Sequence, residues 1–197
     1  MTDTALACLF KSLDPQRVVS PTLETVANTQ LNVVLTGFMA TGKSSVGREL
    51  AARRSLKFVD TDQLIVDQHG SIEQIFASKG EDAFREMERA VAKDLQVSEG
   101  LVIATGGRMM LDDYCASALT SNAHVFCLAA SVEEIQRRYY SDQTGAARPL
   151  LADKDETKLR ELYEERSSAY SQFLQVQTDG KSIAEVVEEI EMFLRSM

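Results

Sequence analysis

The chain has 197 residues, of which 44% are hydrophobic and 26% charged, an ordinary balance for one soluble globular domain with a substantial core. Its formal net charge of −9 argues against a nucleic-acid-binding surface as the main feature. The 3 cysteines are scattered, and neither a Cys-x-x-Cys pair nor a histidine cluster in the sequence suggests a structural metal.

Residues 1–30 are rich in Ser, Thr and Asp and contain Pro15 and Pro21. We expect them to form a partly mobile extension before a domain of residues 31–197. They lack the basic start and long apolar centre of a signal peptide, and the sequence has no apolar run of the ~18 residues that a membrane helix needs. These features predict a cytoplasmic protein with reduced thiols and no membrane partner.

A glycine-rich segment, residues 37–44, lies between an apolar run at 31–36 and a predicted helix at 45–54. In that context the pattern G-x-x-x-x-G-K-[ST] indicates a loop whose backbone N–H groups surround nucleotide phosphates. Lys43 is expected to reach the β- and γ-phosphates, and the Ser44 hydroxyl is expected to bind Mg²⁺. A chance match in a glycine-containing turn is the alternative.

The second predicted strand, residues 56–59, is followed by two alternating carboxylates, Asp60 and Asp62. Both can face the same side, because side chains alternate along an extended strand. One could hold Mg²⁺ through its water, and the other could accept the proton of an attacking alcohol. The alternative is a surface pair that caps the helix predicted to run to about His69.

Two helices are predicted next, over residues 72–79 and 81–96, with a glycine between them. The second is strongly amphipathic, and Arg85 lies beside an apolar position of its inward face. Arg85 is therefore a candidate for the rim of a binding site. The alternative is an exposed ion-pair partner of Glu81 or Glu88.

The third predicted strand, residues 101–104, ends at Gly106 and Gly107, where the backbone can either approach a ligand closely or simply turn. Beyond it we expect a helix at 112–119, a strand at 123–128, a helix from Ser131 to about Tyr140, a helix at 156–171, a strand at 173–177 and a helix at 183–194. The last helix is expected to bury Ile183, Val186, Val187 and Ile190.

Residues 141–155 are polar, lack helical periodicity and are long for a connector, which favours a functional lid. Arg148 in this stretch could fold over phosphates and stabilise their charge. Arg166, on the next helix, could act with Arg85, because guanidinium forks suit an acceptor that carries a carboxylate. A surface ion pair is the alternative for Arg166.

Strands that alternate with helices predict an α/β fold of three layers, α/β/α, around a central parallel sheet of five strands. Ligands of such sheets bind at the carboxyl ends of the strands. The glycine-rich segment, the two aspartates and the Gly106-Gly107 pair all fall there, which predicts one shared site.

These residues resemble the shikimate kinase family, from about Leu31 to the C-terminus and in the family's order. The segments that carry the resemblance are residues 37–47, Asp60-Thr61-Asp62, Gly70-Ser71-Ile72 to Ile75-Phe76, Gly80-Glu81, Phe84-Arg85 with Glu88, Ala104-Thr105-Gly106-Gly107, Arg148-Pro149-Leu150-Leu151, and Arg166 with Tyr170. The resemblance implies a P-loop kinase fold, with an acceptor-binding segment at about 61–98 and a mobile lid at about 141–155. It also implies transfer of the γ-phosphoryl group of ATP to the 3-hydroxyl of shikimate, on the route to chorismate and aromatic amino acids.

The resemblance further implies the role of each site residue. Catalysis falls to Asp62, which holds the reacting hydroxyl, with Lys43 and Arg148. Shikimate is bound by Asp62, Arg85, Gly106, Gly107 and Arg166. ATP is bound by Gly37, Met39, Ala40, Thr41, Gly42, Lys43, Ser44, Ser45, Arg138 (or its neighbour Arg137), Arg148 and Lys181. Ser44 and Asp60 support Mg²⁺. We expect a monomer that binds ATP and shikimate and neither nucleic acid nor a membrane.

The sequence departs from the family at Arg108, where the family usually has a third glycine. Arg108 either points outward without effect or alters the affinity for, or choice of, acceptor. It therefore keeps open a kinase for another small hydroxy acid, such as gluconate. A kinase-like binding or regulatory protein without catalysis is the other alternative, and the intact Lys43, Ser44, Asp60 and Asp62 speak against it.

Overall fold

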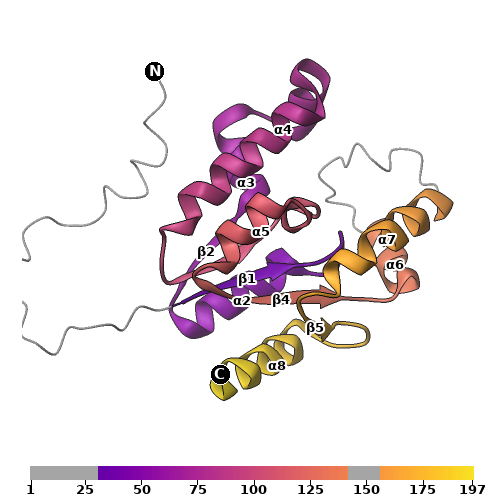
Figure 1. Ribbon diagram of the computed structural model, residues 1–197. Helices are drawn as coiled ribbons and strands as arrows, with labels where there is room; N and C mark the ends of the chain where they lie inside the picture. Colours follow the sequence, from indigo (N-terminus) through magenta and orange to yellow (C-terminus); the bar gives the residue numbers. More distant parts are fainter. Residues whose placement is uncertain (1–30, 142–155) are drawn as a thin grey trace, which may run out of the picture. The chain divides into compact units, whose positions relative to one another are not determined.

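The computed structural model describes residues 31–141 and 156–197, which form an α/β fold around one sheet (Figure 1). Five parallel strands pair in the order β2-β3-β1-β4-β5. The strands are β1 (Asn32–Thr36), β2 (Lys57–Asp60), β3 (Leu101–Ala104), β4 (Ala123–Ala129) and β5 (Leu174–Gln177). The parallel five-stranded sheet predicted from the sequence is confirmed.

Helices cover both faces of the sheet (Figure 1). One face carries α3 (Thr61–His69), α4 (Ile72–Gln96) and α5 (Asp113–Thr120), and the other carries α2 (Lys43–Arg54) and α8 (Ile183–Ser196). α6 (Val132–Ser141) and α7 (Glu156–Tyr170) pack together beside the carboxyl end of β4, and the short helix η1 (Met109–Leu111) precedes α5. The predicted three-layer arrangement is therefore present.

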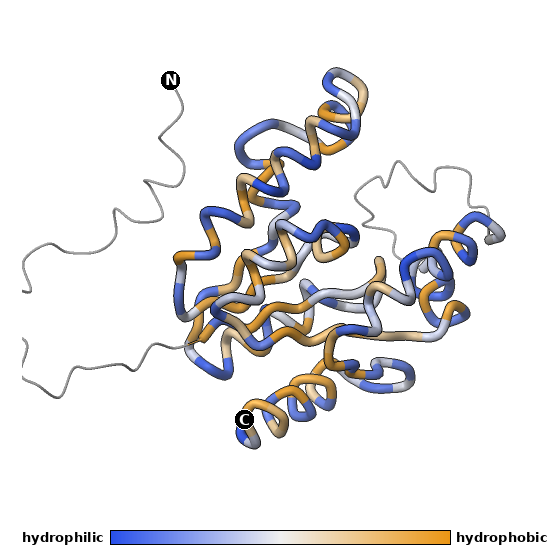
Figure 2. Tube along the Cα trace, in the orientation of Figure 1, coloured by the Kyte–Doolittle hydropathy of each residue, from blue (hydrophilic) through white to orange (hydrophobic). Residues whose placement is uncertain are grey.

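The core lies on both sides of the central strand β1. Val34 belongs to the cluster under α3, α4 and α5, whereas Val33 and Leu35 belong to the cluster under α2 and α8. All three are at most 2% exposed. Figure 2 shows the same pattern, with apolar strands at the centre and helices of mixed hydropathy around them. Burial on both faces explains why these strands have continuous apolar sequences.

Several boundaries differ from the sequence-based prediction. Helix α2 begins at Lys43 and not at Ser45, because Gly42 takes a left-handed conformation (φ 96°) that lets the helix start directly after the glycine-rich loop. By contrast, the predicted break at Gly80 is confirmed: α4 spans both predicted helices, but its backbone is non-helical at Gly80 (φ 81°, ψ 176°), which kinks it there. The predicted burial of Ile183 is wrong: it is 47% exposed at the first position of α8.

The predicted N-terminal extension, residues 1–30, lies outside the described residues. So does most of the predicted lid at 141–155, including Arg148. Within 31–141 and 156–197, every helix is too short or too polar to cross a membrane.

Candidate active site

The loops that follow β1, β2 and β3 meet at one edge of the sheet. The N–H of Thr105, just after β3, donates to the carbonyl of Leu35 on β1 at 3.0 Å. The N–H of Gly106 donates to Thr61 Oγ1, just after β2, at 2.9 Å. These cross-links bring together three segments that are far apart in the sequence, so their side chains line a shared site.

The glycine-rich loop after β1 is tightly built. Gly37 has φ 130°, and a Cβ at this position would lie 2.3 Å from the backbone oxygen of Leu128, so a larger residue does not fit there. The hydroxyl of Thr41 donates to the carbonyl of Phe38 at 2.8 Å and closes the turn. Lys43 Nζ donates to the carbonyls of Gly37 and Phe38, at 2.9 and 2.8 Å, which holds the ammonium group over the loop.

Asp60 connects this loop to helix α3. Its Oδ2 accepts a hydrogen bond from the hydroxyl of Ser44 at 2.7 Å, while its Oδ1 accepts from the backbone N–H groups of Asp62 and Gln63. The capping role considered for Asp60 and its predicted place beside Ser44 therefore occur together. In the described part of the chain no three His, Cys, Asp or Glu side chains gather as a metal site. A divalent cation at Ser44 would thus draw further oxygen ligands from phosphate and water, as Mg²⁺ commonly does.

Asp62, in the first turn of α3, points toward the loop after β3. A Cβ on Gly106 would lie 2.4 Å from Asp62 Oδ1 and 3.2 Å from Glu88 Oε1. The absence of a side chain at Gly106 is therefore what lets two carboxylates approach this loop. Burial raises the pKa of Glu88, which is 2% exposed, and the negative charge of Asp62 adds to this, while the nearby Arg85 opposes it.

Arg85 lies between two carboxylates of its own helix. Its Nη1 donates to Glu88 Oε2 at 2.6 Å, and its Nε and Nη2 donate to Glu81 Oε1 at 3.2 and 2.8 Å. Burial would lower the pKa of Arg85, but these two partners outweigh it and raise the pKa. The ion-pair partners considered for Arg85 are thus real, yet the side chain is only 19% exposed and stays at the site.

Arg166, on α7, is a buried guanidinium, 5% exposed. Its Nε has no hydrogen-bond partner among the described residues, and its guanidinium carbon lies 5.9 Å from the centre of the Phe38 ring. Burial lowers its pKa, and the positive charges of Arg108 and Arg85 lower it further. One turn later, the hydroxyl of Tyr170 donates to the carbonyl of Gly107. A surface ion pair for Arg166, the alternative weighed from the sequence, does not fit this burial.

Arg108 does not point away from the site without contacts. Its Nη1 donates to Glu81 Oε1 at 2.7 Å, the same oxygen that accepts from Arg85. A Cβ on its neighbour Gly107 would meet no described atom within 4 Å.

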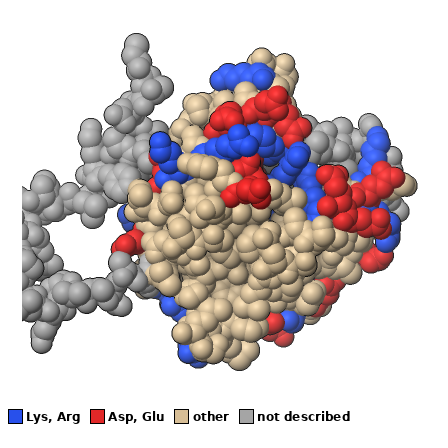
Figure 3. All heavy atoms as spheres, viewed as in Figure 1, with Lys and Arg blue, Asp and Glu red and all other residues tan. Residues whose placement is uncertain are grey.

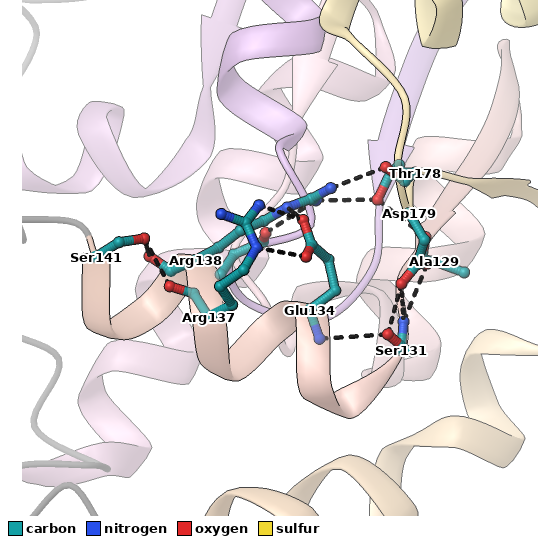
Figure 4. A network of polar contacts seen from close by, with 9 residues as sticks. Ala129, Ser131, Glu134, Arg137, Arg138, Ser141, Thr178 and Asp179 are labelled. Atoms are coloured by element: carbon teal, nitrogen blue, oxygen red, sulfur yellow. Dashed lines mark hydrogen bonds and ion pairs between the residues drawn. The ribbon is translucent and has the colours of Figure 1, made fainter.

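The predicted adenine side of the site is a second polar network, drawn in Figure 4. Arg138 on α6 donates to Glu134, to the hydroxyl and carbonyl of Thr178, and, at 3.4 Å, to the carbonyl of Ala40 in the glycine-rich loop. Arg137 instead pairs with Glu134 and is 67% exposed. Of the two arginines, Arg138 is thus the one in contact with the glycine-rich loop. Lys181 pairs with Glu189 of α8, and its predicted contact with ATP stays a prediction.

Sequence analysis named Glu88 in the segment that resembles the family's acceptor-binding region and as a possible exposed partner of Arg85, but it did not predict that Glu88 is buried or include it among the site residues. The signal was available, because Glu88 follows Phe84 by four residues and precedes Val91 by three, which places it on the inward stripe of α4. A carboxylate on that stripe needs a partner, and Arg85 supplies one.

Comparison with known proteins gives a consistent result. The family model described as "Shikimate kinase" matches residues 39–195. A shikimate kinase of Geobacter sulfurreducens is 42% identical over 167 residues, which are 83% of this chain and 91% of that protein. The solved structure of a shikimate kinase from Acinetobacter baumannii in complex with shikimate is 32% identical, with a TM-score of 0.78, over 85% of this chain and 94% of that chain.

A more distant structure shares only the fold. A gluconokinase from Sinorhizobium meliloti is 20% identical, with a TM-score of 0.56, over 87% of this chain and 100% of that chain. The family model and the relatives above 30% identity decide the assignment, and they agree with the resemblance seen in the sequence. The chain belongs to the shikimate kinase family of ATP-dependent phosphotransferases.

Proposed function

We propose that the edge of the sheet described above binds Mg²⁺–ATP and shikimate together, and that the γ-phosphoryl group passes to the 3-hydroxyl of shikimate there. The observation that carries this proposal is the convergence of three segments. Asp62 and the glycine-rich loop with Lys43 follow the carboxyl ends of β2 and β1, and the buried guanidinium of Arg166 on α7 lies 5.9 Å from the ring of Phe38 in that loop. Phosphoryl transfer needs these parts: a held nucleotide, positive charge and a positioned hydroxyl.

The nucleotide half of the site is residues 37–45. Backbone N–H groups at the start of α2 face bound phosphates, and Lys43 exchanges the loop carbonyls for the β- and γ-phosphates. Ser44 supplies a hydroxyl ligand to Mg²⁺, and Asp60 orients that hydroxyl and accepts from metal-bound water. The magnesium ion neutralises phosphate charge as the phosphoryl group moves. Arg138 lies beside the adenine, and the ATP contacts of Arg148 and Lys181 are part of this proposal.

The acceptor half is made by α3, α4, α7 and the loop after β3. Arg85 and Arg166 bind the acceptor carboxylate, for which the planar guanidinium is well shaped. The Nε of buried Arg166, which has no hydrogen-bond partner within residues 31–141 and 156–197, supports this role, because a buried polar group without a partner costs free energy that an anionic ligand recovers. Gly106 and Gly107 let the acceptor ring approach the backbone, and Asp62 accepts the proton of the attacking hydroxyl.

Shikimate is preferred over other hydroxy acids for a specific reason. The relative from Acinetobacter baumannii was solved with shikimate bound, at 32% identity, whereas the gluconokinase shares the fold alone. A cytoplasmic location, a monomeric state and a surface without affinity for nucleic acid remain predictions from the sequence.

Steady-state turnover with shikimate and with a panel of sugar acids, gluconate included, tests the proposal. We expect Mg²⁺-dependent formation of ADP and a phosphorylated product with shikimate, and far slower turnover with gluconate. A higher kcat/KM for gluconate would overturn the acceptor assignment. ATP binding without turnover of any acceptor would instead support a non-catalytic protein.

A further inference from the structure

One carboxylate oxygen at the acceptor end of the site is shared by two arginines. Glu81 Oε1 accepts from Arg85 Nη2 at 2.8 Å, from Arg85 Nε at 3.2 Å and from Arg108 Nη1 at 2.7 Å. Side-chain hydrogen bonding with Arg85 is the largest cause of the lowered pKa of Glu81, and the charges of Arg85, Arg108 and Arg166 add to it. Glu81 therefore remains an anion at the site throughout the neutral pH range.

This arrangement occupies most of Arg85. Its Nε–Nη2 edge faces Glu81, and its Nη1 faces the buried Glu88. An acceptor carboxylate that binds Arg85 in a bidentate manner has to share or replace the Glu81 contact, because that contact holds one full edge of the fork. Glu81 is thus an internal competitor of the acceptor, and releasing it costs less when a second cation is at hand.

We propose that Arg108 is that second cation: it holds Glu81 when the acceptor carboxylate takes over the edge of Arg85, and so acts as a positioning residue that strengthens acceptor binding. This inference rests on the proposed function, in which Arg85 binds the acceptor carboxylate. It gives a function to Arg108, the residue at which the sequence departs from the family pattern. The contribution of Arg108 to acceptor binding then depends on the negative charge of Glu81.

The local charge balance favours this reading over a purely structural ion pair. The charges of three cations, Arg85, Arg108 and Arg166, act on the carboxylate of Glu81. An incoming carboxylate adds a negative charge, and Arg108 is the cation that remains on Glu81 when Arg85 turns to the acceptor. Figure 3 shows that on this face charged side chains of both signs gather along the upper and right-hand part of the molecule, with few below them.

The backbone conformation at position 108 does not itself require glycine or any other particular residue. Arg108 has φ −123° and ψ −9°, which any L-residue adopts, and its side chain is 48% exposed. The segment after β3 is also joined to α4 by a separate salt bridge, in which Arg89 donates to Asp112 Oδ2 at 2.7 and 3.0 Å. Arg108 is therefore not required to hold the loop after β3 against α4.

The test is a double-mutant cycle on the KM for shikimate with R108A, E81Q and R108A/E81Q. We expect R108A to raise this KM about threefold to fivefold, the size that a partly exposed charge pair supports, with kcat and the KM for ATP nearly unchanged. E81Q removes the competitor, so the double variant should return to within about twofold of the starting KM. R108K should keep most of the effect of the arginine, since a point charge still holds Glu81.

Two outcomes would overturn the inference. If R108A leaves the KM for shikimate unchanged, the ion pair has no role in acceptor binding. If R108A raises the KM and E81Q does not restore it, Arg108 acts on the acceptor directly and not through Glu81.

Two controls separate these outcomes from other failures. R89A breaks a comparable bridge from α4 to the same loop, away from the acceptor, and should change the KM for shikimate by less than about twofold. R85A tests the proposed function beneath the inference. If R85A leaves the KM for shikimate unchanged, the acceptor site itself is wrongly placed, whereas a raised KM in R85A with no effect of R108A rejects only the role of Arg108.

Discussion

Ser44 and Asp60 are bonded across two strand ends: the Ser44 hydroxyl donates to Asp60 Oδ2 at 2.7 Å. The other oxygen of Asp60 caps α3, with the N–H groups of Asp62 and Gln63 at 3.2 and 3.4 Å. One carboxylate therefore fixes both the end of the glycine-rich loop and the first turn of the helix that carries Asp62. The proposed metal position and the proposed catalytic carboxylate are held in register by this single side chain.

Replacement of Asp60 by asparagine separates these two tasks. Asparagine is as good a helix cap as aspartate, so α3 should keep its start. The charge beside Ser44 is lost, and we expect the Mg²⁺ concentration for half-maximal activity to rise about tenfold, as for other groups that orient metal ligands. Titration of activity with Mg²⁺ at saturating ATP measures this. An unchanged Mg²⁺ requirement, with full activity, would show that Asp60 is only a cap.

Asp62→Asn should cut kcat by a factor on the order of 10² to 10⁴, because the amide cannot accept the proton of the attacking hydroxyl. The affinity for ADP, measured by calorimetry, should stay nearly constant, since the glycine-rich loop is untouched. The negative charge of Asp62 contributes to the raised pKa of Glu88, so removing it relieves repulsion, and the free energy of unfolding should not fall. A loss of ADP affinity equal to the loss of kcat would contradict the proposed role.

Gly106→Ala tests whether the site depends on the close approach of Asp62 to the backbone. The new Cβ would lie 2.4 Å from Asp62 Oδ1, so the carboxylate has to move, and a displacement of about 1 Å can reduce kcat on the order of 10²-fold. The cost to folding should be small, because the side chain can rotate away.

Gly37→Ala is the informative comparison for that variant. The new Cβ would lie 2.3 Å from the backbone oxygen of Leu128, and the alanine would have to adopt φ 130°. The clash is with backbone, which cannot rotate away as a side chain can. It should lower the free energy of unfolding by about 1–3 kcal/mol or more. If Gly106→Ala were the less stable of the two and kept its kcat, the assigned role of the Asp62 contact would be wrong.

The parts of the site that the sequence predicted are local ones. The glycine-rich loop is recognisable because its backbone conformation, its lysine and its hydroxyl all occur within residues 37–44, between a strand and a helix. The fold followed in the same way from strands and helices that alternate along the chain, and the sheet order β2-β3-β1-β4-β5 places the loop at its centre.

The rest depends on distances across the fold that no local pattern contains. Arg108 meets Glu81 over 27 positions of sequence, and Arg138 meets Ala40 over 98. Sequence reasoning could name Arg85 and its neighbours but not divide its hydrogen bonds between Glu81 and Glu88. The error at Ile183 has a related cause: periodicity gives the inward face of α8, but not how far the sheet extends beneath its first turn.

The contacts of Asp112, beside the site, can be tested through the free energy of unfolding and its dependence on pH. Its Oδ1 caps α5 by accepting from the N–H of Cys115 at 3.1 Å, and its Oδ2 accepts from Arg89. The hydrogen bond from Arg89 is the main reason that the pKa of Asp112 lies below its ordinary value, with burial opposing it and the cap adding to it. The folded state therefore favours the carboxylate form of this residue.

A lowered pKa in the folded state means stability that is present above the ordinary aspartate value of about 3.9 and is lost as the pH falls through the folded value. Asp112→Asn keeps a capping side chain and loses the charge, so it should lower the free energy of unfolding by less than about 1 kcal/mol at pH 7, the ion pair being partly exposed. Asp112→Ala also loses the cap of α5 and should lower the free energy of unfolding by about 1–2 kcal/mol. In urea unfolding at pH 7 and at an acidic pH below the ordinary aspartate value, the deficit of Asp112→Asn should be smaller at the acidic pH, whereas the extra deficit of Asp112→Ala should persist. A deficit of Asp112→Asn that is equal at both pH values would show that the charge of Asp112 does not stabilise the bridge to α4.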